Sequence, residues 1–560
     1  YKILLAYRCR TRNLGRVSHS FTEVETHLPL GNRTPCARKL RGNSGFLQGR
    51  LNTYDPITLP ALLRIATLSP NSVTMIACPF ARFVSGVYHE GVLRTRNSPE
   101  ISPASQRYAL RGRYWCEPNV SKEVLMSKKF TPMTVAEIID VFVPSPNPFR
   151  WEAFDGSATG PEDAQYKVTI NSLEGLSFIA THPGDVGFAR AYVTDGITVH
   201  GDHPAHPYGI FDALHAMYDK FQKPDAKTLA RVVRSLASMG AFQIQPVPEV
   251  ERASWLRRKL HDGLSKHSKQ RDADVISDHY DVGNDFYELF LGDSMTYTCA
   301  YYPSPDATLE EAQENKYRLI FDKLRLKEGD RHLDVGCGWG GMVRYAARRG
   351  VKSIGVTLSK EQAEWGQRKI EEEGLQDLAE VRFMDYRDIT EEGFDAISAI
   401  GIIEHIGVKN YNDFFKFLHG KLKVGGLMLN HNITYPDNHK TPKGGFIDRY
   451  IFPDGELTGS GNVTKAMQDN GFEVIHTESL RFDYMRTLHD WCENLKDNWD
   501  EACATVGLPT ARLYGIYMAG SEWGFERNII NLYHFLGVKL GEAGSRAGVP
   551  ERRWWEDSRF

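Results

Sequence analysis

The sequence Leu333-Asp-Val-Gly-Cys-Gly-Trp-Gly-Gly341 joins a strand to a glycine-rich turn. The strand is predicted at Arg331–Val335, immediately before the glycines. Glycines let the backbone turn sharply at the carboxyl end of a strand and approach a ligand closely, and open α/β sheets bind ligands at that edge. We therefore expect a ligand here rather than a turn with no ligand.

Strands and helices alternate around this motif, from residue 316 to residue 434. Such alternation is typical of an α/β fold with a doubly wound sheet. The clearest helix is predicted at Lys360–Glu373. The predicted strands are Arg331–Val335, Ser353–Val356, Ala379–Met384, Asp395–Ile400 and Leu427–Asn432.

Two features separate the glycine turn from a dinucleotide site, which its three spaced glycines alone would also fit. Asp334 directly precedes the glycines. About 20 residues further on, where dinucleotide-binding proteins place a ribose-binding acid, the chain has Thr357-Leu-Ser-Lys-Glu-Gln362. Both features favour S-adenosylmethionine (SAM), and Asp385-Tyr386, after the third strand, is predicted to hold its adenine.

Composition excludes several classes of protein. The chain has 560 residues, 41% hydrophobic and 25% charged, with a formal net charge of -3, which predicts two to four folded units and does not indicate nucleic-acid binding. No run of about 18 apolar residues is present, so membrane contact is expected to be peripheral. Eight cysteines without a C-x-x-C pair disfavour a disulfide scaffold or a zinc ribbon and fit a reducing cytosol.

The charge changes near residue 125. Residues 1–125 hold 18 Lys+Arg against 7 Asp+Glu, whereas the remainder holds 50 against 64. Residues 1–125 show no sustained period of 2 or 3.6, and a patterned sequence begins after Met126-Ser-Lys-Lys. We interpret 1–125 as an unstructured or non-native upstream extension, translated in frame. A long Arg-rich targeting segment and a small unrecognised domain are the alternatives.

Residues 126–252 are predicted to form a small α+β domain. Thr134 is a possible N-cap of a helix, and Tyr166–Ile170 and Leu176–Ala180 are predicted strands. A helix is predicted at Ala226–Met239.

Residues 253–278 are predicted to form a basic amphipathic linker. Trp255 and three leucines alternate there with Arg257, Arg258, Lys259 and further cations. Such a segment can lie on an anionic lipid surface, with its apolar face at the acyl boundary. A solvated linker helix packed on its own domain is the alternative.

Several motifs together resemble the cyclopropane-fatty-acyl-phospholipid synthases, and the resemblance covers roughly residues 130 to 540. Within that family the chain is most similar to actinobacterial members, which include enzymes that build mid-chain methyl branches such as tuberculostearic acid. In order, the motifs are His279-Tyr-Asp-Val-Gly-Asn-Asp-Phe-Tyr287, Tyr297-Thr-Cys-Ala-Tyr-Tyr302, the glycine sequence, Glu404-His-Ile-Gly407, Asn430-His-Asn-Ile433 and Tyr450-Ile-Phe-Pro-Asp-Gly455.

The resemblance implies a class I SAM-dependent methyltransferase domain with a lipid-binding cap at 279–560, behind the smaller amino-terminal domain. It implies methyl(ene) transfer from SAM to the double bond of an unsaturated acyl chain in a phospholipid, giving a cyclopropane or a mid-chain methylene or methyl branch. Because the methylated carbocation must lose a proton where no bulk water is present, the family's bound bicarbonate is the implied base.

The same resemblance, with the residues of the glycine motif, gives the candidate site, which includes no metal ligand. The cofactor-binding residues are Tyr297, Thr298, Asp334, Gly336, Gly338, Thr357, Gln362, Asp385 and Tyr386. The catalytic residues are Cys299 and Ile433, as main-chain donors to the anion, and the side chains of Glu404, His431 and Tyr517. Structural roles are the alternative for the last three: a helix start at Glu404-His405, a satisfied histidine and core packing.

Aromatic walls suit a carbocation, because a π face stabilises a cation without attacking it. The tyrosines near the family motifs are Tyr280, Tyr287, Tyr297, Tyr301, Tyr302 and Tyr517. The chain departs from better-known synthases at Glu522 and Trp523, where Cys, Ala or Gly is usual. We interpret this departure as a change in the acyl pocket. Glu522 or Tyr517 is the alternative base if the family's anion site has not carried over to this chain.

Three functional hypotheses remain, because fold alone does not separate them. The first is lipid methylation; the others are a methyltransferase for a small molecule and a lipid- or SAM-binding protein without turnover. The expected partner is an unsaturated phospholipid at a membrane surface, with no nucleic acid. A homodimer, and a separate reductase if the product is a methylene branch, are further expectations. The expected location is cytoplasmic, at the inner leaflet of the plasma membrane.

Overall fold

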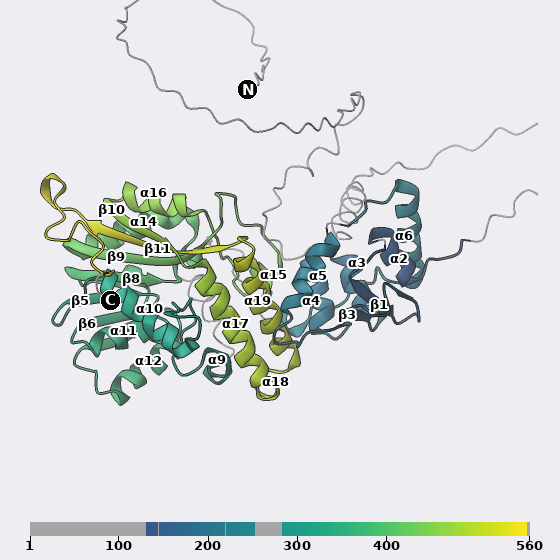
Figure 1. Cartoon of the computed structure of the whole chain (residues 1–560), viewed down its shortest axis with the longest axis horizontal. Coiled ribbons are helices and arrows are strands. Elements are labelled where there is room, and N and C mark those ends of the chain that lie inside the picture. The colour runs from purple at the N-terminus through teal and green to yellow at the C-terminus, as the bar shows by residue number, and fades with distance from the viewer. Residues whose placement is uncertain (1–129, 144, 219, 252–282, 557–560) are drawn as a thin grey trace, which may run out of the picture. The chain divides into compact units, whose positions relative to one another are not determined.

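A seven-stranded sheet carries the glycine-rich sequence (Figure 1). Its strand order is β10-β11-β9-β8-β5-β6-β7; β11 runs antiparallel to both neighbours, and the other pairs are parallel. This order, with helices between the parallel strands, is the class I methyltransferase arrangement, so the predicted fold is confirmed. The strands are β5 (Arg331–Val335), β6 (Lys352–Thr357), β7 (Ala379–Phe383), β8 (Phe394–Ile400), β9 (Leu422–Thr434), β10 (Phe472–Ser479) and β11 (Asn531–Lys539).

The computed structural model describes residues 130–143, 145–218, 220–251 and 283–556. The extension 1–125, the linker 253–278 and Tyr280 lie outside these ranges, and what the sequence predicts of them stays a prediction. Within the described ranges, no helix is both long and apolar enough to cross a bilayer.

The five predicted strands of the large sheet are all present. Four of them match within one or two residues, and the fifth, β9, is longer than predicted. That strand extends from Leu422 to Thr434 because it is paired on both sides, with β8 and with β11. The pairing sets His431 beside Ile400 at the end of β8 and opposite His534 of β11.

Helices connect these strands and cover the carboxyl end of the sheet. The predicted helix Lys360–Glu373 is α12 (Lys360–Glu372), whose N-cap Ser359 accepts a hydrogen bond from the Gln362 N–H. The other helices of this part are α9 (Asn284–Leu291), α10 (Leu309–Lys323), α11 (Gly341–Ala347), α13 (Ile403–Ile406), α14 (Tyr411–Lys421), α15 (Phe446–Tyr450), α16 (Ser460–Asp469), α17 (Arg481–Asp497), α18 (Trp499–Val506) and α19 (Leu508–Glu526), with single 3₁₀ turns η1 (Tyr386–Asp388), η2 (Val408–Asn410) and η3 (Glu542–Gly544).

Residues 130–251 contain a second, four-stranded sheet in the order β2-β1-β3-β4, in which only β1 and β3 are parallel. Thr134 caps its first helix through a complete capping box with Glu137. The elements are α2 (Val135–Phe142), β1 (Phe149–Ala153), β2 (Ala158–Thr159), β3 (Tyr166–Ile170), α3 (Leu173–Thr181), α4 (Asp185–Val193), β4 (Ile197–His200), α5 (Tyr208–Tyr218) and α6 (Ala226–Met239).

The predicted strand Leu176–Ala180 is wrong, because these residues belong to helix α3. A short apolar run does not distinguish a strand from a buried helix. Here Ser172 caps the helix by accepting from the Gly175 N–H. Gly175 also packs against the backbone of Gly196, where an added Cβ would lie 2.2 Å from a carbonyl oxygen. The Ser172 cap and this close contact explain why the segment forms a helix rather than a strand.

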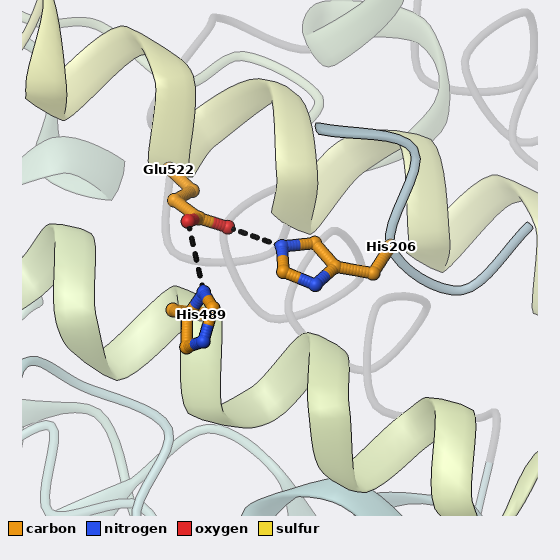
Figure 2. A group of neighbouring side chains, drawn as sticks. All are labelled: His206, His489 and Glu522. Carbon is orange, nitrogen blue, oxygen red and sulfur yellow. Dashed lines mark hydrogen bonds and ion pairs between the residues drawn. The ribbon is translucent and has the colours of Figure 1, made fainter. Parts of the chain in front are cut away.

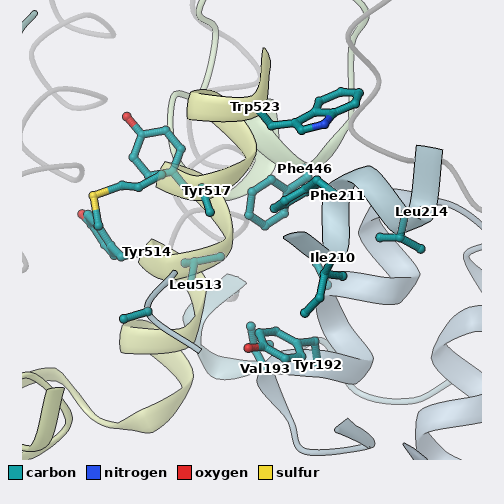
Figure 3. Close-up of a cluster of buried hydrophobic side chains, with 14 of the residues drawn as sticks. Tyr192, Val193, Ile210, Phe211, Leu214, Phe446, Leu513, Tyr514, Tyr517 and Trp523 are labelled. Atoms are coloured by element: carbon teal, nitrogen blue, oxygen red, sulfur yellow. The ribbon is translucent and has the colours of Figure 1, made fainter. Parts of the chain in front are cut away.

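Helix α19 packs against helices of the amino-terminal part, and their buried side chains form one hydrophobic core (Figure 3). Leu513 and Trp523 of α19 lie in the same buried cluster as Tyr192 of α4 and Phe211 of α5. The Trp523 ring stacks on Phe211 at 6.4 Å between centroids, and its indole N–H donates to Asp212 at 2.8 Å. Trp523, one of the two unusual residues, therefore contacts the amino-terminal helices.

Glu522, the other unusual residue, binds two histidines at the same junction, His206 of the amino-terminal part and His489 of the methyltransferase part (Figure 2). Its carboxylate lies 2.8 Å from Nε2 of His206 and 3.2 Å from Nδ1 of His489 on α17, and His206 Nδ1 lies 2.7 Å from Glu493. Glu522 is absent from the residues that line the cavities described below. The interpretation of Glu522 as an alternative base is therefore not supported, because its carboxylate serves this junction.

This junction is expected to weaken as pH rises. Burial lowers the pKa of His206, but its hydrogen bonds to Glu522 and Glu493 outweigh burial and leave the pKa raised. A raised folded-state pKa stabilises the fold fully below the unfolded value of about 6.5, and that stability is lost as pH rises through the folded value. We expect His206→Gln to cost about 1.5 to 3 kcal/mol of unfolding free energy in mild acid, the range for hydrogen bonds to charged groups.

Denaturant unfolding of the wild type and of His206→Gln across pH measures this difference. A difference that stays constant between acidic and alkaline pH would contradict the imidazolium account. Metal analysis is the control, because the ligand atoms of His206, His489 and Glu522 lie within 4.8 Å of one another. Bound zinc would mean that a metal ion, rather than a proton, holds the junction.

Candidate functional site

A pocket lies at the carboxyl edge of the large sheet, where the sequence predicts a ligand. We call it the glycine pocket. It is lined from the ends of β5, β6 and β8 and from the segment before α10. The lining residues include Tyr297, Thr298, Lys316, Asp334, Gly336, Gly338, Trp339, Thr357, Gln362, Tyr386, Gly401, His405 and Phe452.

Two glycines shape the floor of this pocket. Gly336 has a φ of 72°, and an added Cβ there would lie 2.8 Å from Ile402. Gly338 has a φ of 54°, and an added Cβ would meet only Gln362, at 4.0 Å. The first glycine is required by the turn and the second leaves the backbone open to a ligand, as the motif predicts.

A buried acid and a buried base face the same pocket. Burial raises the pKa of Asp334 to about 7, against the hydrogen bond from Ser398 and the charge of Lys316. Burial lowers the pKa of Lys316 to about 7. The Lys316 ammonium donates to Thr298 Oγ1 at 2.9 Å. The pocket thus offers a carboxylate and an ammonium to a zwitterionic ligand, although no sequence motif marked Lys316.

The predicted ribose and adenine residues divide into two groups. Thr357 donates to the Gln362 side chain at 2.8 Å, and both line the pocket, as does Tyr386. Asp385 is absent from the lining: its carboxylate accepts from Arg387 Nε at 2.7 Å and caps the turn η1. The structure therefore does not bring Asp385 to the predicted adenine site, because its neighbour Arg387 holds it.

A second pocket, the apolar pocket, adjoins the first. The two share five lining residues: Tyr297, Thr298, Gly401, His405 and Phe452. The residues that line the apolar pocket but not the glycine pocket include Asp185, Glu404, His431, Ile433, Tyr435, Phe446, Tyr484, Leu488, Tyr517, Phe525 and Leu532. A group held in the glycine pocket can therefore reach a chain held in the apolar pocket through this shared wall.

Aromatic rings surround the shared wall. Tyr297 donates to the hydroxyl of Tyr517 at 3.3 Å, and the rings of Phe452 and Tyr517 meet edge to face at 5.8 Å. Tyr287 lies behind Tyr297, with 5.4 Å between ring centroids. Of the predicted tyrosines in the described residues, only Tyr297 and Tyr517 line a pocket.

Tyr301 and Tyr302 line neither pocket, which agrees with the core-packing alternative for these two rings. The hydroxyl of Tyr302 donates to Asp490 at 2.7 Å, and Arg486 lies over its ring at 3.9 Å. Tyr301 packs against the core beneath α10.

Glu404 is a buried carboxyl group at the start of α13. Its Oε1 accepts from the Ile433 N–H at 2.6 Å, while its Oε2 is buried without a hydrogen-bond partner among the described residues. Burial raises its pKa to about 7, more than the Ile433 N–H lowers it. The proton of the neutral form therefore belongs on Oε2, which then acts as a donor.

His431 is held by a chain of hydrogen bonds that fixes its tautomer. The Lys323 ammonium binds Glu478 and also lies 3.0 Å from His534 Nδ1. The contacts of Glu478 lower the pKa of its carboxyl group to about 2, although burial raises it. Because an ammonium only donates, His534 Nδ1 accepts and its Nε2 carries the hydrogen toward His431 Nδ1, 2.8 Å away.

His431 consequently carries its hydrogen on Nε2. That atom is buried and has no partner among the described residues, and His431 lines the apolar pocket. Burial, aided by Lys316 and Lys323, lowers the pKa of His431 well below its ordinary value. A neutral imidazole with Nε2–H is a hydrogen-bond donor, not a base. Sequence reasoning found His431 but missed Lys323 and His534, which no local motif marks.

Of the two residues predicted to be main-chain donors, Ile433 is already hydrogen-bonded and Cys299 does not line either pocket. The Ile433 N–H is used by Glu404, so in this structure it serves the carboxyl group rather than an anion. Cys299 is buried and its Sγ donates to the carbonyl oxygens of Ala300 and Leu480, at 3.0 and 3.7 Å. Cys299 is not among the residues that line either pocket, and its predicted main-chain role stays a prediction.

Several known proteins are similar to this chain. A family model described as mycolic acid cyclopropane synthetase matches residues 267–535. A probable fatty acid methyltransferase of Mycobacterium tuberculosis is 54% identical over 426 residues, which cover 76% of this chain and 99% of that protein. The cyclopropane-fatty-acyl-phospholipid synthase of Escherichia coli is 34% identical over 50% of this chain and 71% of its own length. Among solved structures, the cyclopropane synthase MmaA2 from Mycobacterium tuberculosis is 33% identical over 48% of this chain and 98% of its own, with a TM-score of 0.45.

Proposed function

Because this chain belongs to the mycolic acid cyclopropane synthetase family and is a SAM-dependent methyltransferase acting on lipid acyl chains, we propose that its substrate is an unsaturated chain within a membrane phospholipid. The product is either a cyclopropane or a mid-chain methylene or methyl branch. The observation that best supports this proposal is the wall that the glycine and apolar pockets share. The residues of the glycine pocket would hold SAM, which would supply a methyl group to a double bond held by the residues of the apolar pocket.

An isolated alkene is a weak nucleophile, so the site must position the methyl donor against the double bond and exclude water. Tyr297 and Phe452 stand where the methyl group crosses between the pockets, with Tyr517 beside them. Their π faces stabilise a carbocation without adding to it. The apolar remainder of the second pocket excludes the water that would otherwise trap the cation.

The polar end of the apolar pocket fits a small anion such as the bicarbonate implied by the family. Two buried atoms there have no hydrogen-bond partner within the described part of the chain, Glu404 Oε2 and His431 Nε2, and both are donors in the protonation states derived above. When bound, bicarbonate supplies the base that takes the cation's proton. Glu404, His431 and Tyr517 line the same pocket and would hold the anion.

We also propose peripheral association with the cytoplasmic leaflet of the plasma membrane, since the substrate lies in a bilayer. The sequence of 253–278, outside the described residues, supports this location. A separate reductase is required only for a saturated methyl branch, so its involvement depends on the product. The homodimer stays a prediction, which sedimentation equilibrium of the full chain tests.

Replacing Arg257, Arg258 and Lys259 together by Gln should weaken binding to anionic vesicles. Each cation near such a surface contributes about 1 kcal/mol at low salt, and the attraction falls within a Debye length. Co-sedimentation with phosphatidylglycerol vesicles, at low and high salt, measures the change. Vesicle binding equal to that of the wild type would favour the solvated-linker interpretation.

Turnover on matched lipids tests the proposed substrate. The enzyme with SAM should release S-adenosylhomocysteine in the presence of dioleoyl phospholipid, and not with the distearoyl lipid that lacks a double bond. Release that is independent of the double bond would favour a small-molecule methyltransferase, and no release with any lipid would favour a binding protein. Chromatography against standards, or NMR of the fatty esters, then separates a ring from a branch.

A further inference from the structure

A third cavity lies within residues 130–217, walled by the small sheet and its helices. We call it the amino-terminal cavity. Among its lining residues only Asp185 carries a charge, and nearly all the others are aliphatic or aromatic. They include Val135, Ile138, Phe142, Trp151, Ile170, Leu176, Phe188, Tyr192, Val199, Ile210, Phe211, Leu214 and Met217, with Phe446 and Ile516 from the methyltransferase part.

This cavity adjoins the apolar pocket, with which it shares two lining residues. Asp185 and Phe446 line both. The Asp185 carboxylate accepts from the Phe446 N–H at 2.7 Å and from the Val186 N–H at 2.9 Å, so it ties the start of α4 to α15. Asp185 and Phe446 thus border both spaces.

The two spaces are alike in size and lining. Counting the space that is open to solvent, the amino-terminal cavity encloses about 1350 Å³ and the apolar pocket about 1470 Å³. Protein interiors are close-packed, and spaces much larger than a water molecule are few. A second large apolar space beside the acyl pocket therefore indicates a second apolar ligand rather than a packing fault.

We propose that the amino-terminal cavity holds the second, non-reacting acyl chain of a two-chain phospholipid. This inference rests on the proposed function, in which the first chain occupies the apolar pocket. The two chains of one phospholipid leave adjacent carbons of glycerol, so they require two neighbouring apolar spaces such as those on either side of Phe446. When the phospholipid moves from the bilayer into the protein, neither of its acyl chains is then exposed to water.

Filling the cavity should discriminate between lipids with two chains and lipids with one. Leu214→Trp places a bulky ring in the cavity, whereas Leu229→Trp makes the same change on α6, at a partly buried residue outside the cavity lining. For Leu214→Trp, we expect kcat/KM to fall about tenfold or more with dioleoyl phosphatidylglycerol. With oleoyl lysophosphatidylglycerol it should stay within about twofold, and Leu229→Trp should change neither.

An equal loss on both lipids would overturn the proposal, because the cavity would then hold the far end of the reacting chain or support the fold. No loss on either lipid would also overturn it. If the wild type turns over neither lipid, the proposed function fails instead. The two failures are therefore distinguishable.

A binding measurement checks the same proposal without turnover. Trp151 lines the cavity, and bromine atoms on a lipid chain quench indole fluorescence at short range. A phospholipid with one oleoyl chain and one brominated saturated chain should quench the wild type more than Trp151→Phe. The unbrominated lipid is the control. Equal quenching in both proteins would place the second chain elsewhere and contradict the proposal.

Discussion

Glu404→Leu is expected to lower kcat by about 10²–10⁴-fold, the range for loss of a positioned proton-transfer group or its support. The change removes the Oε2 donor and the acceptor of the Ile433 N–H without leaving a buried charge. SAM binding should stay nearly unchanged, because Glu404 lines only the apolar pocket. Single-turnover kinetics and calorimetric titration of S-adenosylhomocysteine measure the two effects separately.

Glu404→Gln is the matched control, since an amide keeps one acceptor and one donor. Because the pKa of Glu404 is raised to about 7, the wild-type kcat should fall as pH rises through that value. The Gln variant should keep much of the activity at neutral pH and lose this decline. It should also be at least as stable as the wild type in mild alkali, where burial of the ionised carboxylate costs stability.

A Gln variant as inactive as the Leu variant would contradict the protonated-donor account and indicate an ionised Glu404. Bicarbonate dependence gives a second check: decarbonated buffer should slow the wild type, and added bicarbonate should restore it. An enzyme indifferent to bicarbonate would mean that another group takes the proton.

Asp334→Ala is expected to weaken SAM binding by about 10- to 150-fold, which corresponds to hydrogen bonding by a charged group of about 1.5 to 3 kcal/mol. Asp334 lines the glycine pocket at the end of β5, beside the buried Lys316. Calorimetric titration with SAM measures the loss, and the limiting rate at saturating SAM should change less.

Asp385→Ala is the matched control for donor binding. Arg387 holds that carboxylate outside the pocket lining, so we expect a much smaller loss of affinity. An equal loss in both variants would restore the sequence-based prediction that Asp385 holds the adenine, and would contradict the placement described here.

Sequence predicted the sheet well because each strand has a local signature. Apolar runs bounded by glycines and polar turns located β5 to β9, and Asp334 with the following glycines located the ligand edge. Leu176–Ala180 failed because an apolar run of five residues fits both structures; the Ser172 cap and the close Gly175–Gly196 contact decided it.

Side-chain roles that depend on distant partners could not be predicted. The tautomer of His431 depends on Lys323 and on His534, which lies 103 residues away in the sequence. Glu522 was conspicuous in the sequence, but its role is set by His206, 316 residues away. Such contacts follow from the register of β9 with β11 and from the docking of α19, not from spacing along the chain.

We propose that the methyl carbon of SAM ends on the former double bond of a phospholipid acyl chain. The most direct test of this proposal uses SAM with an isotopically labelled methyl group and a phospholipid with one oleoyl and one saturated chain, followed by fragmentation mass spectrometry of the intact lipid. We predict one labelled carbon in the oleoyl-derived chain, at its original double-bond positions, and none in the saturated chain or the headgroup. Label in the headgroup, or in both chains equally, would contradict the account.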